Sequence, residues 1–309
     1  MSNKPILLIA FGGNALIQKG QSGTASQQLS NLKAPLEQLA KLSKDYRIVI
    51  THGNGPQVGN LLLQQEACKE VPSMPLEIVG AMTQGQIGYM IESTLDTALM
   101  GLGINDKRFV TLITYVVVDE NDPGFANPTK PIGPFYTPEE AKKVSYRLKE
   151  TDKGLRRVVA SPRPQTIIER NEIKDLVAMD YIVICCGGGG IPVVRKGREF
   201  AGVEAVIDKD LATSVLGGEI KADLFVIATD VDGAYTNWGK DDQTLLRDIS
   251  LDELRKHSDA GQFSSGSMGP KVQAIAEFVE NTGNRGIICN LDDITAAIAG
   301  KVGTQVSRG

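Results

Sequence analysis

Three lysines stand in segments whose backbone is restrained by prolines, glycines or neighbouring aspartates. Lys130 lies between prolines in the string PTKP, Lys209 lies between aspartates in IDKD, and Lys271 ends the glycine turn GSMGPK. Cations held in this way suit phosphoryl transfer, because that reaction needs charge stabilisation and in-line positioning more than covalent help from the protein. A single lysine is more often a solvated surface charge, and it is the shared context of the three that favours a phosphate site.

Other side chains that could do chemistry are sparse. Asp208 and Asp210 flank Lys209, where one of them could hold the lysines in place or could cap the N-terminus of a helix. The two histidines, His52 and His257, are far apart in the sequence. His52 precedes a glycine turn, and a structural hydrogen bond to that turn is favoured over contact with a ligand. No zinc-type spacing occurs, so no metal ligand is assigned from the protein.

Four glycine-rich turns each follow or flank a predicted strand. They are Gly12-Gly13-Asn14, Gly53-Asn54-Gly55-Pro56, residues 187–190 and residues 266–271. Glycine lets the backbone approach a ligand closely, and a strand that ends in glycines before a helix presents N–H groups to an anion. In an open α/β sheet such turns gather at the carboxyl edge of the strands, where ligands bind. Four turns of this kind predict a phosphate-binding edge, although each alone could be an ordinary tight turn.

Two well-known phosphate motifs are absent. A P-loop has four residues between its glycines and a Ser or Thr after the lysine, whereas GSMGPKV has two residues between them and a valine after the lysine. The dinucleotide fingerprint needs a third glycine, but GGGGIP has proline at that place and GNGPQV has valine. A nicotinamide-dependent dehydrogenase, one of the alternatives, is therefore disfavoured.

Short apolar runs that alternate with helical patterns must position these turns. Strands are predicted at residues 6–11, 47–51, 109–118, 181–186, 224–229 and 286–289. Helices are predicted at residues 27–42, 57–67, 165–178, 209–216, 271–280 and 292–299. Several of the runs are apolar without alternation, as in parallel strands that are covered on both faces. We therefore expect an α/β fold with an open, mainly parallel, twisted sheet between helix layers.

Residues 119–164 interrupt this alternation of strands and helices. They contain seven prolines and many charges, and their apolar residues show no clear periodicity. Aromatic and apolar residues, among them Phe125, Phe135 and Tyr146, are too frequent for a disordered linker. A small ordered subdomain that protrudes beside the sheet is favoured. We expect a single domain over residues 1–309, with one lobe at about 1–205 that carries this subdomain and a second lobe at about 206–309.

Composition limits the classes of partner. The chain has 309 residues and a formal net charge of −4, which argues against a general nucleic-acid or membrane-surface binder. The apolar run 6–11 is too short for a signal segment or a membrane span. The four cysteines form no C-x-x-C pair and are interpreted as buried reduced thiols. These features favour a cytoplasmic protein.

Seven strings together resemble the carbamate kinases of the amino acid kinase superfamily. In chain order they are AFGGNAL, THGNGPQVG, PTKPIGPFY, CGGGGIPV, EAVIDKDLA, TDVDGAYTN and GSMGPKV, and they span nearly the whole chain. PTKPIGPFY discriminates best, because it belongs to the protruding subdomain that distinguishes carbamate kinases from their relatives. The resemblance implies the amino acid kinase fold, a homodimer, and reversible phosphoryl transfer between ATP and carbamate that gives ADP and carbamoyl phosphate. We expect the reaction to run toward ATP synthesis, in the catabolism of arginine or of other carbamoyl compounds.

The same resemblance implies roles for individual residues. The catalytic group would be Lys130, which reaches carbamate, and Lys209 and Lys271, which stabilise the moving phosphoryl group and are oriented by Asp210. The carbamate or phosphoryl end would lie against Gly12, Gly13, Asn14, Gly53, Asn54 and Gly55. The nucleotide would lie against Thr229, Asp230, Gly233, Tyr235, Met268 and Gly269. Mg²⁺ would arrive with ATP or ADP and keep several waters, so that few protein ligands are needed.

Some positions depart from the family pattern, and two further alternatives stay open. Ala160 and Arg163 stand where relatives often have a proline and an acidic residue. A kinase for an amino-acid carboxylate on the same fold would commonly place a lysine in the first-strand turn, where this chain has Ala10 and Phe11. A nucleotide-binding regulator without chemistry would keep TDVDGAYTN but could lose the lysines, and all three are present.

Overall fold

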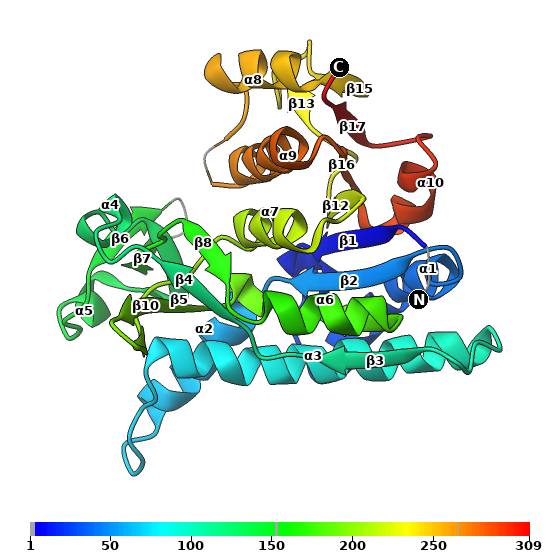
Figure 1. The fold of residues 1–309 in the computed structure, drawn as a ribbon. Coiled ribbons are helices and arrows are strands. Elements are labelled where there is room, and N and C mark those ends of the chain that lie inside the picture. Colours follow the sequence, from blue (N-terminus) through cyan, green and yellow to red (C-terminus); the bar gives the residue numbers. More distant parts are fainter. Residues whose placement is uncertain (1–3, 152–153, 265) are drawn as a thin grey trace.

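Strands that are apolar along their whole length form the centre of the protein. The computed structural model describes residues 4–151, 154–264 and 266–309, without the side chains of Asn14, Pro134 and Thr151. Its largest sheet has eight strands (Figure 1). In spatial order they are β15 (Asp248–Ser250), β17 (Thr304–Ser307), β16 (Arg285–Asn290), β12 (Leu224–Thr229), β1 (Ile6–Phe11), β2 (Arg47–His52), β9 (Tyr181–Ile184) and β3 (Arg108–Thr111). Neighbouring strands pair in parallel except β16 with β17, which confirms the predicted mainly parallel sheet.

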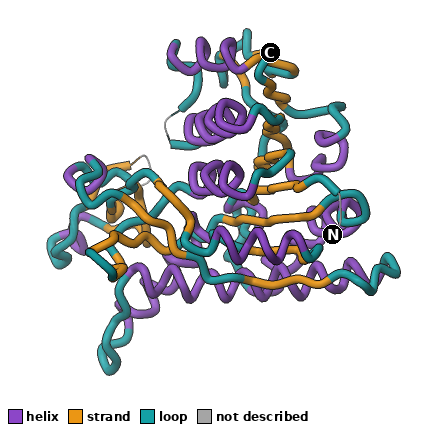
Figure 2. Tube along the Cα trace, in the orientation of Figure 1, coloured by secondary structure: helices purple, strands orange, loops and turns teal. Residues whose placement is uncertain are grey.

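Helices cover both faces of this sheet, because alternate residues of its strands point to opposite sides. Leu7 and Ile9 of β1 pack in one apolar cluster, and Leu8 and Ala10 pack in another. The first cluster is completed by α1 (Ala25–Leu42), α3 (Leu76–Gly101) and α10 (Ile294–Ile298). The second is completed by α6 (Arg170–Ala178), α7 (Lys209–Ile220), α8 (Leu251–Asp259) and α9 (Met268–Thr282). Figure 2 shows these helix layers on either side of the strands.

Smaller sheets extend the structure beyond the carboxyl ends of the central strands. A four-stranded sheet contains β11 (Glu199–Gly202), β10 (Ile191–Lys196), β4 (Tyr115–Val118) and β8 (Pro164–Ile167). A three-stranded antiparallel sheet contains β5 (Lys130–Tyr136), β7 (Gly154–Val159) and β6 (Leu148–Thr151). The remaining short elements are α4 (Pro123–Ala126), α5 (Pro138–Ala141), β13 (Tyr235–Thr236), β14 (Thr244–Leu245), η1 (Gly13–Ala15), η2 (Gly187–Gly189) and η3 (Leu291–Asp293). The segment 119–164 thus folds into strands and short helices, and Arg163 joins it to α9 through an ion pair with Glu277 at 2.7 Å.

Two predicted elements differ from the structure, one in its continuity and one in the type of its first residues. The run 109–118 is two strands, β3 in the central sheet and β4 in the four-stranded sheet, because the chain leaves the sheet edge at Thr114. There the N–H of Thr114 donates to the side chain of Gln84. The predicted helix at 165–178 begins only at Arg170, since residues 164–167 form β8 and pair with β4. In both places a strand partner distant in sequence decides the conformation.

The longest helix, α3, was not predicted. Its 26 residues include Gly80, Gly85 and Gly88, each of which lowers intrinsic helix propensity by about 1 kcal/mol relative to alanine. Tertiary contacts favour the helix instead, and a Cβ at Gly88 would lie 2.3 Å from the Thr111 methyl group. Among the described residues, no helix is both long enough and apolar enough to cross a membrane.

Candidate active site

The predicted glycine turns meet at the carboxyl ends of β1, β2 and β9. They line one hollow of about 430 Å³, which also contains Lys130, Lys209 and Lys271 and is called here the lysine cavity. The turns hold one another through the backbone: the N–H of Gly12 donates to Ala228 O at 3.0 Å, and the N–H of Gly53 donates to Phe11 O at 3.1 Å. The turns at Gly13 and Gly53 are packed closely, because a Cβ at Gly53 would lie 3.4 Å from the Gly13 nitrogen. The grouping expected from sequence is therefore present.

Helix α2 (Gly55–Ala67) starts at this cavity. Its N-cap residue, Asn54, makes no side-chain cap and instead donates from Nδ2 to Thr83 Oγ1 on α3 at 2.8 Å. The positive end of the helix dipole is thus directed at the cavity without a competing side-chain acceptor from Asn54, an arrangement that favours an anion. Gly12, Gly13, Gly53 and Gly55 line the cavity as predicted, whereas the side chain of Asn14 lies outside the described part of the structure.

His52 has the structural role that the sequence favoured. Its ring is buried and its Nδ1 lies 3.1 Å from the carbonyl oxygen of Gly53. Burial lowers the pKa of His52 to about 4, the contact with Gly53 opposes that change, and the nearby charge of Lys209 adds to it. The imidazole is therefore neutral at physiological pH and supports the turn.

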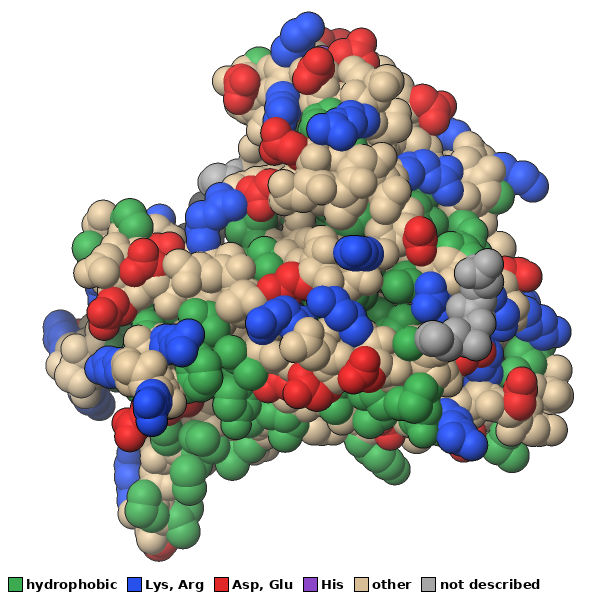
Figure 3. All heavy atoms as spheres, viewed as in Figure 1, with side chains coloured by type: hydrophobic (Ala, Val, Ile, Leu, Met, Phe, Trp, Pro, Cys, Tyr) green, Lys and Arg blue, Asp and Glu red, His purple; other side chains and the backbone are tan. Residues whose placement is uncertain are grey.

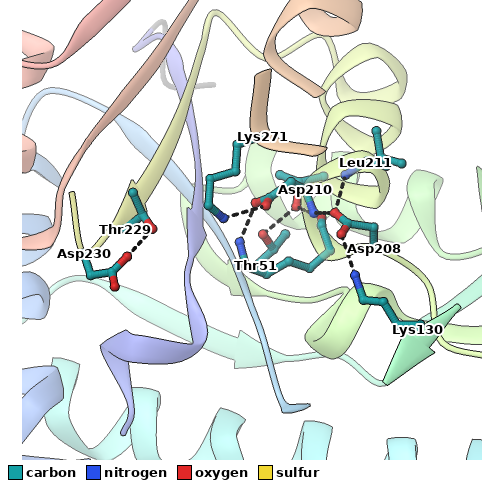
Figure 4. A network of polar contacts seen from close by, with 10 residues as sticks. Thr51, Lys130, Asp208, Asp210, Leu211, Thr229, Asp230 and Lys271 are labelled. Atoms are coloured by element: carbon teal, nitrogen blue, oxygen red, sulfur yellow. Dashed lines mark hydrogen bonds and ion pairs between the residues drawn. The ribbon is translucent and has the colours of Figure 1, made fainter. Parts of the chain in front are cut away.

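A buried carboxylate joins two of the three lysines (Figure 4). Asp210 lies in the first turn of α7 and is 3% exposed. Its Oδ1 accepts a short hydrogen bond from Lys209, and its Oδ2 accepts one from Lys271 Nζ at 3.0 Å. Lys271 comes from the first turn of α9, so that the carboxylate connects two helices at the cavity wall. This is the geometry that the resemblance implied for Asp210.

Burial and charge act against each other in this cluster. Burial would raise the pKa of the Asp210 carboxyl, but Lys209 and Lys271 together hold that pKa below its ordinary value. Burial lowers the pKa of the Lys209 ammonium and Lys271 adds to that effect, while Asp210 opposes it. One carboxylate therefore keeps two cations close together in a dry environment, where a charged ligand would be stabilised more strongly than in water.

Asp208 has both of the roles that the sequence left open for the two aspartates. It is the N-cap of α7, and its Oδ1 accepts from the N–H of Asp210 at 3.0 Å. Its Oδ2 accepts from Lys130 Nζ at 2.8 Å. Lys130 is the first residue of β5, so that this ion pair joins the three-stranded sheet to the cavity wall. All three predicted lysines are thus assembled at one place.

A second hollow of about 620 Å³ adjoins the first and is called here the aromatic cavity. Thr229, Asp230, Ser267 and Lys271 line both hollows, which therefore form one continuous site. Tyr235 and Met268, for which the resemblance implied contact with a nucleotide, line the aromatic cavity. Its lining also includes residues that the sequence reasoning missed, namely Asn237, Trp238, Lys240, Gln262, Phe263 and Ser264.

Sequence signals existed for two of these missed residues, since Asn237 is the last residue of the string TDVDGAYTN. Trp238 is the single tryptophan of the chain and directly follows the string TDVDGAYTN. Its ring meets that of Tyr235 at a centroid distance of 5.1 Å, and the side chain is 60% exposed. Phe263 and Gln262 come from the loop before α9, for which no comparable signal was available.

Two predicted binding residues have a different placement. Neither Gly233 nor Gly269 is among the described residues that line the two cavities. A Cβ at Gly233 would lie 2.6 Å from Thr304 Oγ1, so that glycine is required there for backbone packing. Gly269 donates its N–H to Ser264 O at 2.8 Å and has no space for a Cβ beside that carbonyl. Both glycines shape the loops around the aromatic cavity without lining it.

Protein ligands for a metal are few. Within the described ranges, no group of three or more His, Cys, Asp or Glu side chains is placed to hold an ion. Asp230 is an acidic residue at the junction of the two cavities, and Thr229 Oγ1 donates to its Oδ1 at 3.1 Å. Such a site fits Mg²⁺ that keeps its waters and arrives with phosphate oxygens, and it does not fit a metal that needs a full set of protein ligands.

Known proteins resemble this chain over its whole length. The Amino acid kinase family matches residues 5–290. A carbamate kinase of Thermococcus kodakarensis is 49% identical over 98% of this chain and 99% of its own length, and one of Haemophilus influenzae is 45% identical over 98% and 96%. A carbamate kinase from Giardia lamblia bound to AMP-PNP superimposes with a TM-score of 0.94 at 42% identity, covering 99% of both chains. With its lysine cluster and glycine turns assembled at one sheet edge, the chain belongs to the amino acid kinase family and, within it, to the carbamate kinases.

Proposed function

We propose that the chain catalyses reversible phosphoryl transfer between ATP and carbamate, giving ADP and carbamoyl phosphate. The observation that carries this proposal is the Lys209–Asp210–Lys271 cluster at the junction of two continuous cavities. The aromatic cavity has the size and the ring-lined wall for an adenine nucleotide. The lysine cavity has glycine turns and cations for a small anion and the phosphoryl group.

In this mechanism the nucleotide and the carbamate lie on opposite sides of the transferring phosphoryl group. Lys209 and Lys271 would neutralise its oxygens, because both ammoniums are held at the cavity junction by Asp210. Lys130 would bind the carbamate or carbamoyl end from the opposite wall, which requires it to exchange its contact with Asp208 for the substrate. Carbamate is already an anion and needs no general base, which agrees with the low pKa of His52, because such an imidazole is a poor proton acceptor.

We also propose that Mg²⁺ accompanies the nucleotide. Asp230 would hold it at the junction of the cavities, directly or through one of its waters. When bound, the ion would supply further positive charge to the phosphate oxygens. The lysine cluster would then complete the neutralisation from the other side.

The direction and the setting of the reaction are further parts of the proposal. Carbamoyl phosphate is a mixed anhydride, so transfer of its phosphoryl group to ADP releases free energy and favours ATP synthesis during the breakdown of arginine or other carbamoyl compounds. Free thiols at Cys185, Cys186 and Cys289, all buried, support a reducing compartment such as the cytoplasm.

A homodimer is proposed from an exposed apolar face. Figure 3 shows hydrophobic side chains gathered along the lower side of the molecule, over α2, α3 and their connection. On α3, Ile78, Met82 and Tyr89 are exposed by 42%, 46% and 68%. An apolar face of this kind on a helix is typical of a surface that a second subunit covers.

The first test is ATP formation from ADP, Mg²⁺ and carbamoyl phosphate, with acetyl phosphate as a comparison donor. We expect rapid ATP formation that is selective for carbamoyl phosphate. Folded protein that forms no ATP from either donor would contradict the proposed activity. Equal use of acetyl phosphate would contradict the assigned substrate.

A further inference from the structure

Three polar side chains meet far from the lysine cavity, at the other end of the elements that build it. Tyr136 at the end of β5 donates its hydroxyl to Glu66 Oε1 at 3.2 Å, near the end of α2. Tyr146, in the connection between α5 and β6, reaches the same Glu66 oxygen at 3.0 Å and makes a short contact with the Tyr136 hydroxyl. We call this group the Glu66 cluster. The roles proposed above for the lysines and glycine turns do not account for it.

The cluster is partly shielded from water. Tyr136 is 9% exposed, and burial raises the pKa of both tyrosine hydroxyls, so they remain protonated donors. Each hydroxyl has one proton: Tyr136 donates to Glu66, and Tyr146 donates to Glu66 or to Tyr136. The Arg157 guanidinium lies 4.6 Å from the centre of the Tyr146 ring and covers it. Hydrogen bonds to a carboxylate in such a place are among the stronger ones in proteins.

Strand β5 runs along α2 from the cavity to this cluster. At the cavity end, Lys130 and Val58 line the same hollow. In the middle, a Cβ at Gly59 would lie only 3.5 Å from the Gly133 Cα, so strand and helix are in close contact. At the far end stand Tyr136 and Glu66. The helix rises about 16 Å from Gly55, which also lines the hollow, to Glu66, and the strand spans about 20 Å from Lys130 to Tyr136.

From this arrangement we propose that Glu66, Tyr136 and Tyr146 are positioning residues that hold the three-stranded sheet against α2 and thereby keep Lys130 at the lysine cavity. The inference rests on the proposed function, in which Lys130 binds carbamate or carbamoyl phosphate. Without the cluster, β5 keeps its apolar contacts with α2 but loses its polar anchor. The fraction of molecules with Lys130 in place then falls, and the apparent affinity for the ligand of Lys130 falls by the same factor.

The kinetic test uses Glu66→Ala, Tyr136→Phe and Tyr146→Phe in the full chain. We expect the KM for carbamoyl phosphate to rise about tenfold in Glu66→Ala and about threefold in each Phe variant, because a hydrogen bond to a charged group contributes on this scale. We expect the KM for ADP and the kcat at saturation to change less than twofold, since the aromatic cavity is built by other elements. Glu66→Gln keeps one acceptor oxygen and is expected to recover part of the affinity. Tyr181→Phe, in the central sheet, is the matched control.

A second measurement does not depend on activity. The acetylation rate of Lys130 by a water-soluble N-hydroxysuccinimide ester is followed by peptide mass spectrometry, with exposed Lys33 on α1 as internal reference. We expect Lys130 to react several times faster in Glu66→Ala than in the native chain or in Tyr181→Phe. Unchanged labelling in folded Glu66→Ala would overturn the inference, as would faster labelling with an unchanged KM for carbamoyl phosphate. A native chain that forms no ATP would instead contradict the proposed function, and the labelling result would still decide whether the cluster holds Lys130.

Discussion

Asp210→Asn tests whether one buried carboxylate holds the two lysines of the cavity junction. The change keeps the shape of the side chain but removes the charge between Lys209 and Lys271, whose side chains are 12% and 14% exposed. Breaking a buried ion pair by removing one partner typically destabilises a protein by about 3–5 kcal/mol. The amide must also turn its NH₂ toward one ammonium, and these two groups are both hydrogen-bond donors, so that contact is lost. We therefore expect the free energy of unfolding to fall by about 3 kcal/mol. A loss of this size still leaves most molecules folded.

We expect the substitution to lower kcat by a larger factor than the loss of stability alone would explain. With the lysines no longer held, the loss in kcat should be about 10²-fold or more, the scale for a lost charge stabiliser.

The effect on stability depends on pH because the pKa of Asp210 is lower in the folded than in the unfolded chain. Its contribution is present above the unfolded pKa and is lost as the pH falls through the folded pKa. The stability difference between native chain and variant should therefore be full near pH 7 and shrink in acid.

Asp180→Asn is the matched control. Asp180 also stands between two lysines, with Lys107 Nζ at 2.6 Å and Lys4 Nζ at 3.8 Å, but it is about a third exposed and is absent from the cavity linings. Its φ of 63° is tolerated well by asparagine. Because the Lys107 side chain is only 5% exposed, we expect a stability loss similar to that of Asp210→Asn, about 3 kcal/mol, with an unchanged kcat. Urea unfolding and steady-state ATP formation on both variants give the comparison. A kcat for Asp210→Asn within tenfold of the native value, or an equal loss of kcat in Asp180→Asn, would refute the reasoning.

Further changes test other parts of the site and surface. Lys271→Ala should lower kcat about 10²- to 10³-fold with the fold retained, measured by ATP formation and circular dichroism; near-normal turnover would exclude its role. ADP should alter the fluorescence of the single tryptophan, and Trp238→Ala should raise the Kd for ADP about tenfold, the scale for stacking on an aromatic ring. His52→Gln should flatten the loss of stability between about pH 6.5 and pH 4, because there the unfolded chain gains a proton that the buried imidazole does not; an unchanged slope in urea titrations would contradict this. Met82→Glu should convert the proposed dimer to a monomer in sedimentation experiments, and a monomeric native chain would contradict the dimer proposal.

Much of the central fold followed from local composition. The string ILLIAF is buried at every position, as a parallel strand covered on both faces requires. The helix pattern at 27–42 agrees with α1, where Thr24 and Gln27 form a capping box. The predictions failed where the chain changes sheets, at Thr114, and where packing outweighs weak local propensity, as in the glycine-containing helix α3. In those places the partner that stabilises the element is remote in sequence.

The candidate site divides in the same way. Residue type and local restraint pointed to Lys130, Lys209 and Lys271, because prolines, glycines and caps act over only a few residues. Residue types alone left open which aspartate holds which lysine, although the family resemblance implied Asp210 for Lys209 and Lys271. The sequence gave no sign that Gly233 packs against Thr304.

The amino-acid sequence by itself determined that glycine turns follow apolar strands and that three lysines stand in restrained segments, a combination that favours phosphate chemistry. Only the tertiary structure decided that Asp210 bridges Lys209 to Lys271, which lies 61 residues away, and that Tyr146 meets Glu66 across 80 residues. The physical reason is that secondary structure depends on interactions between near neighbours in the chain. The direction and the partner of a buried polar side chain depend on how whole helices and sheets pack, because only that packing removes water and brings remote charges within hydrogen-bonding distance.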